Sequence, residues 1–192
     1  MVSRSADHPR PVAVLIGPPG SGKSTVATEL ARLLGVARLD TDDMVVEVSG
    51  SSIPDLFIDH GEAHFRAIER ECVHRALASH NGVLSLGGGA ILDPQTQAEL
   101  AGHAVAFLDV SLRVASRRSG FDHGRPLMSL NPRGQWLRLM QDRRGIYEAL
   151  ATVRIETDDL SPAQVAEQVA AGLGLVAAGA DGPARQEGAS RG

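Results

Sequence analysis

The sequence predicts one α/β domain with a five-stranded parallel sheet that is doubly wound by helices. Short apolar segments alternate along the chain with stretches of helical periodicity, which is typical of parallel strands joined by crossover helices. The predicted strands are residues 12–16, 37–39, 83–86, 104–110 and 152–156. A chain of 192 residues is long enough for one domain with a proper core and too short for two comfortable domains.

The helices are predicted from apolar spacing and from end signals. Residues 61–78 show the clearest helical pattern, because apolar side chains recur there at three- and four-residue steps: Phe65, Ile68, Cys72, Val73 and Leu77. Gly35 is a plausible stop for a helix over residues 23–34. Ser161 and Pro162 occupy the cap and first-turn positions of a last helix. Another predicted helix begins with residues 44–48. Three more cover residues 94–100, 112–118 and 132–150.

Composition excludes several classes of function. Apolar residues make up 43% of the chain and charged residues 22%, as in ordinary globular proteins. The net charge of −4 argues against a nucleic-acid partner, because phosphate backbones favour a basic surface. No apolar run approaches the roughly 20 residues of a membrane span. A single cysteine, Cys72, excludes a disulfide within the chain and fits a cytoplasmic protein.

The two ends of the chain differ from its centre. Residues 1–11 are polar and contain proline, and residues 175–192 are rich in Ala, Gly, Ser and charge without an apolar period. We therefore expect both ends to be disordered and residues 12–174 to form the folded domain.

Residues 17–24 match the phosphate-loop motif G-x-x-x-x-G-K-[ST] in full, between the first predicted strand and a helix. Glycines let the backbone N–H groups converge on an anion, and the following helix directs its positive end to the same point. Lys23 adds a full charge for the terminal phosphates, and Ser24 offers an oxygen to Mg²⁺. The motif predicts nucleotide binding, but it does not distinguish a kinase from a GTPase, a motor or a regulatory switch.

Two carboxylates, Asp40 and Asp42, follow the second predicted strand. The carboxyl ends of parallel strands form the ligand crevice of such sheets. Alternating along an extended segment, the two side chains can face different targets. One can hold Mg²⁺ through water, and the other can accept a hydrogen bond from a substrate hydroxyl and take its proton. Thr41 or Asp42 could instead cap the helix that follows, and this alternative stays open.

Three consecutive glycines, Gly87, Gly88 and Gly89, end the third predicted strand. Such a run costs backbone entropy and makes sense where a ligand approaches main-chain N–H groups closely. A plain tight turn is the alternative.

Arginines on two predicted helices suggest a carboxylate substrate. Arg66 and Arg143 would each, taken alone, be typical of a solvated surface, but together they provide the planar donors that a carboxylate needs. Arg117, Arg118 and Arg125 bracket an aperiodic segment, residues 119–131. A loop of this length in a small domain is usually functional. In a phosphotransferase it would be a lid that excludes water.

With these motifs the chain resembles the shikimate kinase family over residues 12–173. The similarity rests on the order and spacing of seven short motifs. They are G-x-P-G-S-G-K-S-T at 17–25, L-D-T-D at 39–42, S-I-x-D-x-F at 52–57, G-E-x-x-F-R-x-x-E at 61–69, L-G-G-G-A at 86–90, R-P-L at 125–127 and R-x-x-x-Y at 143–147.

The resemblance implies a three-layer P-loop NTPase fold like that of the nucleoside-monophosphate kinases. It also implies transfer of the γ-phosphoryl group of MgATP to the 3-hydroxyl of shikimate, a step toward chorismate and the aromatic amino acids. The partners would be ATP and shikimate, with neither nucleic acid nor membrane, and a monomer is the simpler expectation.

The resemblance also implies roles for individual residues. The catalytic residues would be Asp42, Lys23 and Arg125. ATP would be bound by Gly20, Ser21, Gly22, Lys23, Ser24, Thr25, Arg118, Arg125 and Pro162, with Arg118 and Pro162 enclosing the adenine. Shikimate would be bound by Asp42, Arg66, Gly87, Gly88, Gly89 and Arg143, and one Mg²⁺ ion by Ser24 and, through water, Asp40.

The chain departs from the family in two places. Leu160 stands where some members carry a basic residue near the nucleotide, so we predict no such contact there. The lid shares little beyond residues 125–127. Two other functions remain open: a related gluconate or adenylate kinase, which a substrate panel would separate, and a catalytically inactive nucleotide-binding regulator.

Overall fold

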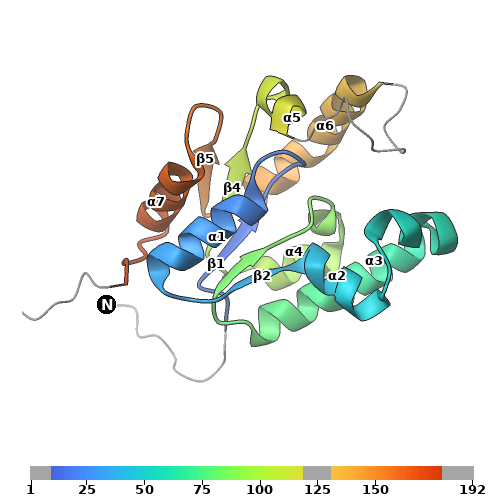
Figure 1. Ribbon diagram of the computed structural model, residues 1–192, viewed down its shortest axis with the longest axis horizontal. Helices are drawn as coiled ribbons and strands as arrows, with labels where there is room; N and C mark the ends of the chain where they lie inside the picture. Colours follow the sequence, from blue (N-terminus) through green and yellow to red (C-terminus); the bar gives the residue numbers. More distant parts are fainter. Residues whose placement is uncertain (1–9, 119–130, 179–192) are drawn as a thin grey trace, which may run out of the picture.

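The computed structural model describes residues 10–118 and 131–178, which form a sheet with helices on both faces (Figure 1). The five strands lie in the order β2-β3-β1-β4-β5, and every neighbouring pair is parallel. The strands are β1 Ala13–Ile16, β2 Arg38–Asp40, β3 Val83–Ser85, β4 Val105–Asp109 and β5 Val153–Glu156. The predicted five-stranded parallel sheet is therefore confirmed.

Seven α-helices and a short 3₁₀ helix, η1, connect the strands in the described residues. They are α1 Lys23–Leu34, α2 Thr41–Ser49, α3 Ile53–Ser79, η1 Ala90–Leu92, α4 Pro94–Leu100, α5 Leu112–Arg118, α6 Pro132–Leu150 and α7 Pro162–Gly172. Ser161 caps α7 through a capping box and Pro162 follows in the first turn, as the sequence predicted.

Alternate side chains of the strands build two separate cores, one on each face of the sheet. Val14, Leu84 and Phe107 pack with α3, α5 and α6, and Phe107 stacks on Tyr147 with 5.0 Å between ring centroids. Leu15 and Val83 pack against α1 and α7 on the other face. This alternation follows from the two-residue period of a strand. It fixes which side chains at the strand ends face the phosphate loop.

Helices α2 and α3 form a smaller cluster beside the sheet. Val45, Leu56, Phe65 and Cys72 are buried together there, so the single cysteine has a packing role. The apolar pattern of the sequence predicted α3 only from residue 61. Its first part, over residues 53–60, begins at the cap Ser52 and bends at Gly61, where φ is +79°. The bend interrupts the apolar period, which is why the pattern did not extend across it.

The ends of the domain are packed further than the sequence suggested. The amide of Val12 donates to the carbonyl of Gly82, and Pro11 is buried. At the other end, the amide of Ala178 donates to the carbonyl of Leu33 at 3.1 Å. This bond places Ala178 beside the end of α1, while the domain boundary at residue 174 stays a prediction. The rest of the expected disordered ends, residues 1–9 and 179–192, lies outside the described residues.

Candidate active site

The phosphate loop lies between β1 and α1, as predicted. Gly22 caps α1 with a left-handed backbone, φ +88°, and no side chain accepts a hydrogen bond from the first turn. The ammonium of Lys23 donates to the carbonyls of Gly17 at 2.9 Å and Pro18 at 3.2 Å, so it closes the loop from below. Backbone N–H groups at such a helix start form an anion site.

Burial of Lys23 has an electrostatic consequence. Loss of solvent lowers the pKa of its ammonium to about 8, although the nearby carboxylates of Asp42 and Asp40 raise it, and Arg143 adds to the lowering. The ammonium of Lys23 is therefore sensitive to every charge brought into the pocket. Nearby negative charge favours the protonated form.

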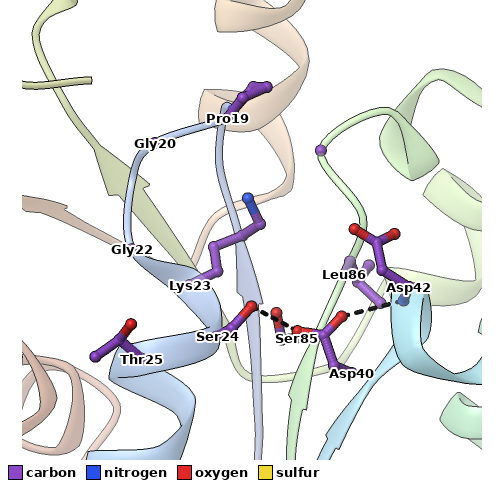
Figure 2. Close-up of a pocket in the computed structure, with 11 residues that line it drawn as sticks. Pro19, Gly20, Gly22, Lys23, Ser24, Thr25, Asp40, Asp42, Ser85 and Leu86 are labelled. Carbon is purple, nitrogen blue, oxygen red and sulfur yellow. Dashed lines mark hydrogen bonds between the residues drawn. The ribbon is translucent and has the colours of Figure 1, made fainter. Parts of the chain in front are cut away.

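Asp40 connects the phosphate loop to the second strand. Its Oδ2 accepts from the hydroxyl of Ser24 at 2.7 Å, and its Oδ1 accepts from the amide of Asp42 at 3.1 Å (Figure 2). Two hard oxygen donors, Ser24 Oγ and Asp40 Oδ2, thus lie side by side where Mg²⁺ could be held directly or through water, and this donor set fits that ion. Among residues 10–118 and 131–178, no three His, Cys, Asp or Glu side chains form a metal cluster.

The expectation that Asp40 and Asp42 alternate on an extended segment is wrong. Helix α2 begins at Thr41, with Asp40 as its cap, so Asp42 lies in the first helical turn. The alternative that Thr41 or Asp42 caps this helix is also wrong, because the cap is Asp40. Thr41 instead accepts from the amide of Gly87 at 2.9 Å through its buried hydroxyl. The carboxylates still face different targets, because the turn of the helix rotates one away from the other.

The glycine run packs against side chains of the site. A Cβ atom on Gly89 would lie 2.5 Å from Nη1 of Arg66, and one on Gly88 would lie 3.4 Å from both Gly17 O and Pro19 Cδ. These glycines thus have a reason that the sequence did not indicate: neighbouring side chains and the phosphate loop approach them closely. The carbonyl of Gly88 accepts from Arg143 Nη1 at 2.9 Å and from the hydroxyl of Tyr147 at 2.6 Å.

Arg66 is held by two carboxylates. Its Nη1 donates to Glu69 Oε2 at 2.5 Å, and its Nε and Nη2 donate to Glu62 Oε1 at 3.3 Å. These bonds raise the pKa of Arg66 despite its burial. Glu69 is itself buried, and burial raises the pKa of its carboxyl against the influence of Arg66. Glu69 belongs to one of the motifs of the sequence but had no predicted role, because only the fold shows that it is buried.

The candidate adenine side lies at the end of β5. Arg118 donates through Nη1 to the hydroxyl of Thr157 at 3.0 Å and through Nη2 to its carbonyl at 2.7 Å, which fixes the guanidinium plane. Pro162 is the first residue of α7. Arg125 and the lid over residues 119–130 lie outside the described residues.

One pocket of about 260 Å³ joins the phosphate loop to the strand ends. Figure 2 shows Lys23 and Asp42 on opposite sides of it, with Ser24, Asp40 and Ser85 along its floor. Eight of the predicted site residues line it: Gly20, Gly22, Lys23, Ser24, Thr25, Asp40, Asp42 and Gly88. Pro19, Ser85 and Leu86 also line it and were not predicted. Four other predicted residues lie beside this lining: Arg143 bonds to Gly88 O, Gly87 lies close to Asp42, and Gly89 lies close to Arg66. Ser21 is buried.

Comparisons with known proteins agree on one family. The family description SKI, shikimate kinase, matches residues 19–173. The shikimate kinase of Salinispora arenicola is 54% identical over 161 residues, which cover 84% of this chain and 96% of that protein. The shikimate kinase of Streptomyces avermitilis is 50% identical and covers 86% and 96%.

Solved structures add the fold. The shikimate kinase of Acinetobacter baumannii in complex with shikimate matches with a TM-score of 0.79 at 31% identity, over 84% of this chain and 90% of that one. A gluconokinase of Sinorhizobium meliloti 1021 matches with a TM-score of 0.51 at 22% identity, over 84% and 90%, and shares the fold alone.

Proposed function

This chain belongs to the shikimate kinase family, and from that premise we propose which residues hold its two substrates and how they transfer the phosphoryl group. The reaction is the transfer of the γ-phosphoryl group of ATP to the 3-hydroxyl of shikimate, which gives shikimate 3-phosphate and ADP. The observation that carries the assignment of roles is that Lys23 and Asp42 line one pocket from opposite sides.

ATP is held by the phosphate loop. The N–H groups of residues 20–25 and the ammonium of Lys23 surround the β- and γ-phosphates. Lys23 exchanges its bonds to the carbonyls of Gly17 and Pro18 for bonds to phosphate oxygens. The base lies between Arg118 and Pro162, where the bonds to Thr157 support the orientation of the guanidinium.

Shikimate is held at the ends of β2 and β3. Its carboxylate binds the guanidiniums of Arg66 and Arg143, which suit planar recognition of an anion. Arg66 keeps its orientation through Glu69, and Arg143 starts from its bond to Gly88 O. The carboxylate of Asp42 binds the ring hydroxyls, and Gly87, Gly88 and Gly89 leave the room that the acid needs.

In the reaction, the 3-hydroxyl oxygen of shikimate forms a bond to the γ-phosphorus of ATP. The bond from that phosphorus to the β–γ bridging oxygen breaks, and its electron pair leaves with ADP. The hydroxyl proton passes to the carboxylate of Asp42. Lys23 stabilises the charge that develops on the phosphate oxygens, and Arg125 does so from the lid.

Kinases that use ATP generally need a divalent metal ion, and we propose that the ion here is Mg²⁺. Ser24 and Asp40 would hold the ion, Asp40 through water, and the hydrogen bond that brings their oxygens together supports this assignment. When bound, the ion supplies positive charge to the phosphates.

We also propose a cytoplasmic monomer. One chain supplies the proposed residues for both substrates, and its single cysteine is a buried thiol. No helix in residues 10–118 and 131–178 is long and apolar enough to cross a membrane.

The proposal is tested by a coupled assay of ADP release with MgATP. Shikimate should support release, while quinate, gluconate and AMP at equal concentration should support at most a few per cent of that rate. Equal rates with gluconate or AMP would assign the chain to a neighbouring kinase activity. No shikimate-dependent release would refute catalysis and favour a nucleotide-binding regulator.

A further inference from the structure

One face of α6 donates hydrogen bonds to carbonyls of two loops, the phosphate loop and the glycine run. The indole Nε1 of Trp136 donates to the carbonyl of Pro19 in the phosphate loop at 3.1 Å. About two and three turns later, respectively, Arg143 and Tyr147 donate to the carbonyl of Gly88 in the glycine run. Residues 136, 140, 143 and 147 are spaced as on one helical face. Helix α6 therefore contacts both the phosphate loop and the glycine run.

The phosphate loop and the glycine run also lie close to each other. A Cβ atom on Gly88 would lie 3.4 Å from the ring of Pro19, so the peptides that α6 holds are neighbours. α6 is itself anchored away from this point, because Arg144 donates to the buried carboxylate of Asp109 on β4 through two bonds of 3.0 Å. The helix thus has fixed support from which to hold both loops.

The bond from Trp136 fixes the orientation of a peptide group in the phosphate loop. Every described peptide bond is trans, so the carbonyl of Pro19 and the amide of Gly20 point in opposite directions within one peptide plane. With the carbonyl directed at α6, the Gly20 amide is directed away from that helix, and Gly20 lines the pocket. Trp136 is 3% exposed, so its N–H has no solvent alternative and the carbonyl is its partner.

We propose that Trp136 is a positioning residue, which holds the Pro19–Gly20 peptide against α6 and so sets the phosphate loop for nucleotide binding. This inference rests on the proposed function for the identity of the nucleotide. The inference assigns the two bonds to different substrates. The bond of Trp136 supports the binding of ATP, and the bond of Tyr147 to Gly88 supports the binding of shikimate.

The test removes the N–H at constant shape. Replacement of Trp136 by β-(3-benzothienyl)alanine puts sulfur in place of the N–H and leaves the ring volume nearly unchanged, and Trp136→Phe is the genetically simple companion. Calorimetry should show a Kd for MgADP about tenfold higher in both variants, the scale of one lost hydrogen bond to a buried carbonyl. The KM for ATP should rise similarly, while the KM for shikimate should stay within about twofold.

Matched variants on the same helix control for general disturbance. Tyr147→Phe removes the donor to Gly88 and should leave the Kd for MgADP within about twofold. Leu137→Ala changes a side chain that is 47% exposed on another face and should alter neither affinity. An unaltered Kd for MgADP in the benzothienylalanine variant would overturn the proposal, whether or not the midpoint of urea unfolding falls. Trp136 would then have a role in packing alone.

The assay also separates this inference from the proposed function. MgADP binding is measured without shikimate, so a native chain that binds MgADP normally but phosphorylates no shikimate would refute the activity alone. The effect of the Trp136 variants on that binding would still decide the positioning role.

Discussion

A Cβ atom at Gly87 would lie 2.5 Å from Oδ1 of Asp42, so the carboxylate occupies the space that any other residue at the end of β3 would need. The same atom would lie 2.8 Å from Oε1 of Glu69. Because Gly87 has no side chain, the carboxylates of Asp42 and Glu69 can both lie next to its backbone. Since Asp42 is the proposed base, this close approach leads to the first prediction.

Gly87→Ala is expected to displace Asp42 and to lower kcat by at least about tenfold, because even small misplacement of a catalytic group is costly. Steady-state kinetics with both substrates measure the effect. Gly145→Ala is the control, since nothing lies within 4 Å of a Cβ atom at that exposed position in α6. The control should keep full activity and stabilise the protein to urea by about 0.5–1 kcal/mol. Unchanged kcat in Gly87→Ala would contradict the assigned position of Asp42.

Asp42→Asn is expected to lower kcat by at least about 100-fold, the scale for a positioned base. Asn keeps the size of the side chain but cannot take the hydroxyl proton. Asp43→Asn is the matched control, because Asp43 is exposed and pairs with Arg38 at 3.2 Å outside the pocket. A loss below tenfold in Asp42→Asn, similar to that of the control, would reduce Asp42 to a structural role.

Arg143→Ala is expected to raise the KM for shikimate and to leave the KM for ATP nearly unchanged. The reason is that Arg143, bonded to Gly88 O, is a proposed partner of the shikimate carboxylate. Arg138→Ala on the same helix alters an exposed arginine and should change neither constant. If the KM for ATP rose instead, the assignment of the carboxylate site would be wrong.

Nucleotide binding is expected to take up a proton at alkaline pH through Lys23. The pKa of its ammonium is about 8 in the free protein, and phosphate oxygens raise it in the complex. Below pH 8 the group is already charged and contributes no pH dependence. Above pH 8 it must gain a proton on binding, so affinity for MgADP should fall by up to about tenfold per pH unit.

Calorimetry at pH 9 in two buffers of different ionisation enthalpy measures this proton uptake. Lys23→Arg keeps a charged group at every pH used and should bind without the uptake. Lys23→Ala should lose turnover altogether, and near-normal turnover in that variant would refute the role of the phosphate loop.

Much of the fold and of the phosphate site could be predicted because the signals are local in the sequence. The motif at residues 17–24 contains within eight positions the glycines, Lys23 and Ser24 that the structure brings around one pocket. The start of α2 at Thr41 could not be predicted from apolar spacing, because the cap is Asp40, a residue that also ends a strand and receives Ser24.

The residues that sequence reasoning missed act over long separations. Trp136 contacts Pro19 across 117 positions, and Tyr147 contacts Gly88 across 59. Glu69 becomes a partner of the site only because α3 buries it beside Gly87. No short pattern in the sequence predicts contacts between residues so far apart. They depend on which faces of α3 and α6 the sheet accepts.

The central place of β1 in the sheet has a consequence for biosynthesis of the protein. β1 leaves the ribosome first among the strands, yet its neighbours are β3 and β4, whose pairing partners to Val14 are Leu84 and Val105. A nascent chain therefore holds its nucleotide motif without a finished sheet until β5 has been translated. Ligands added during synthesis should protect it from proteolysis only after β5 and the start of α7 have emerged.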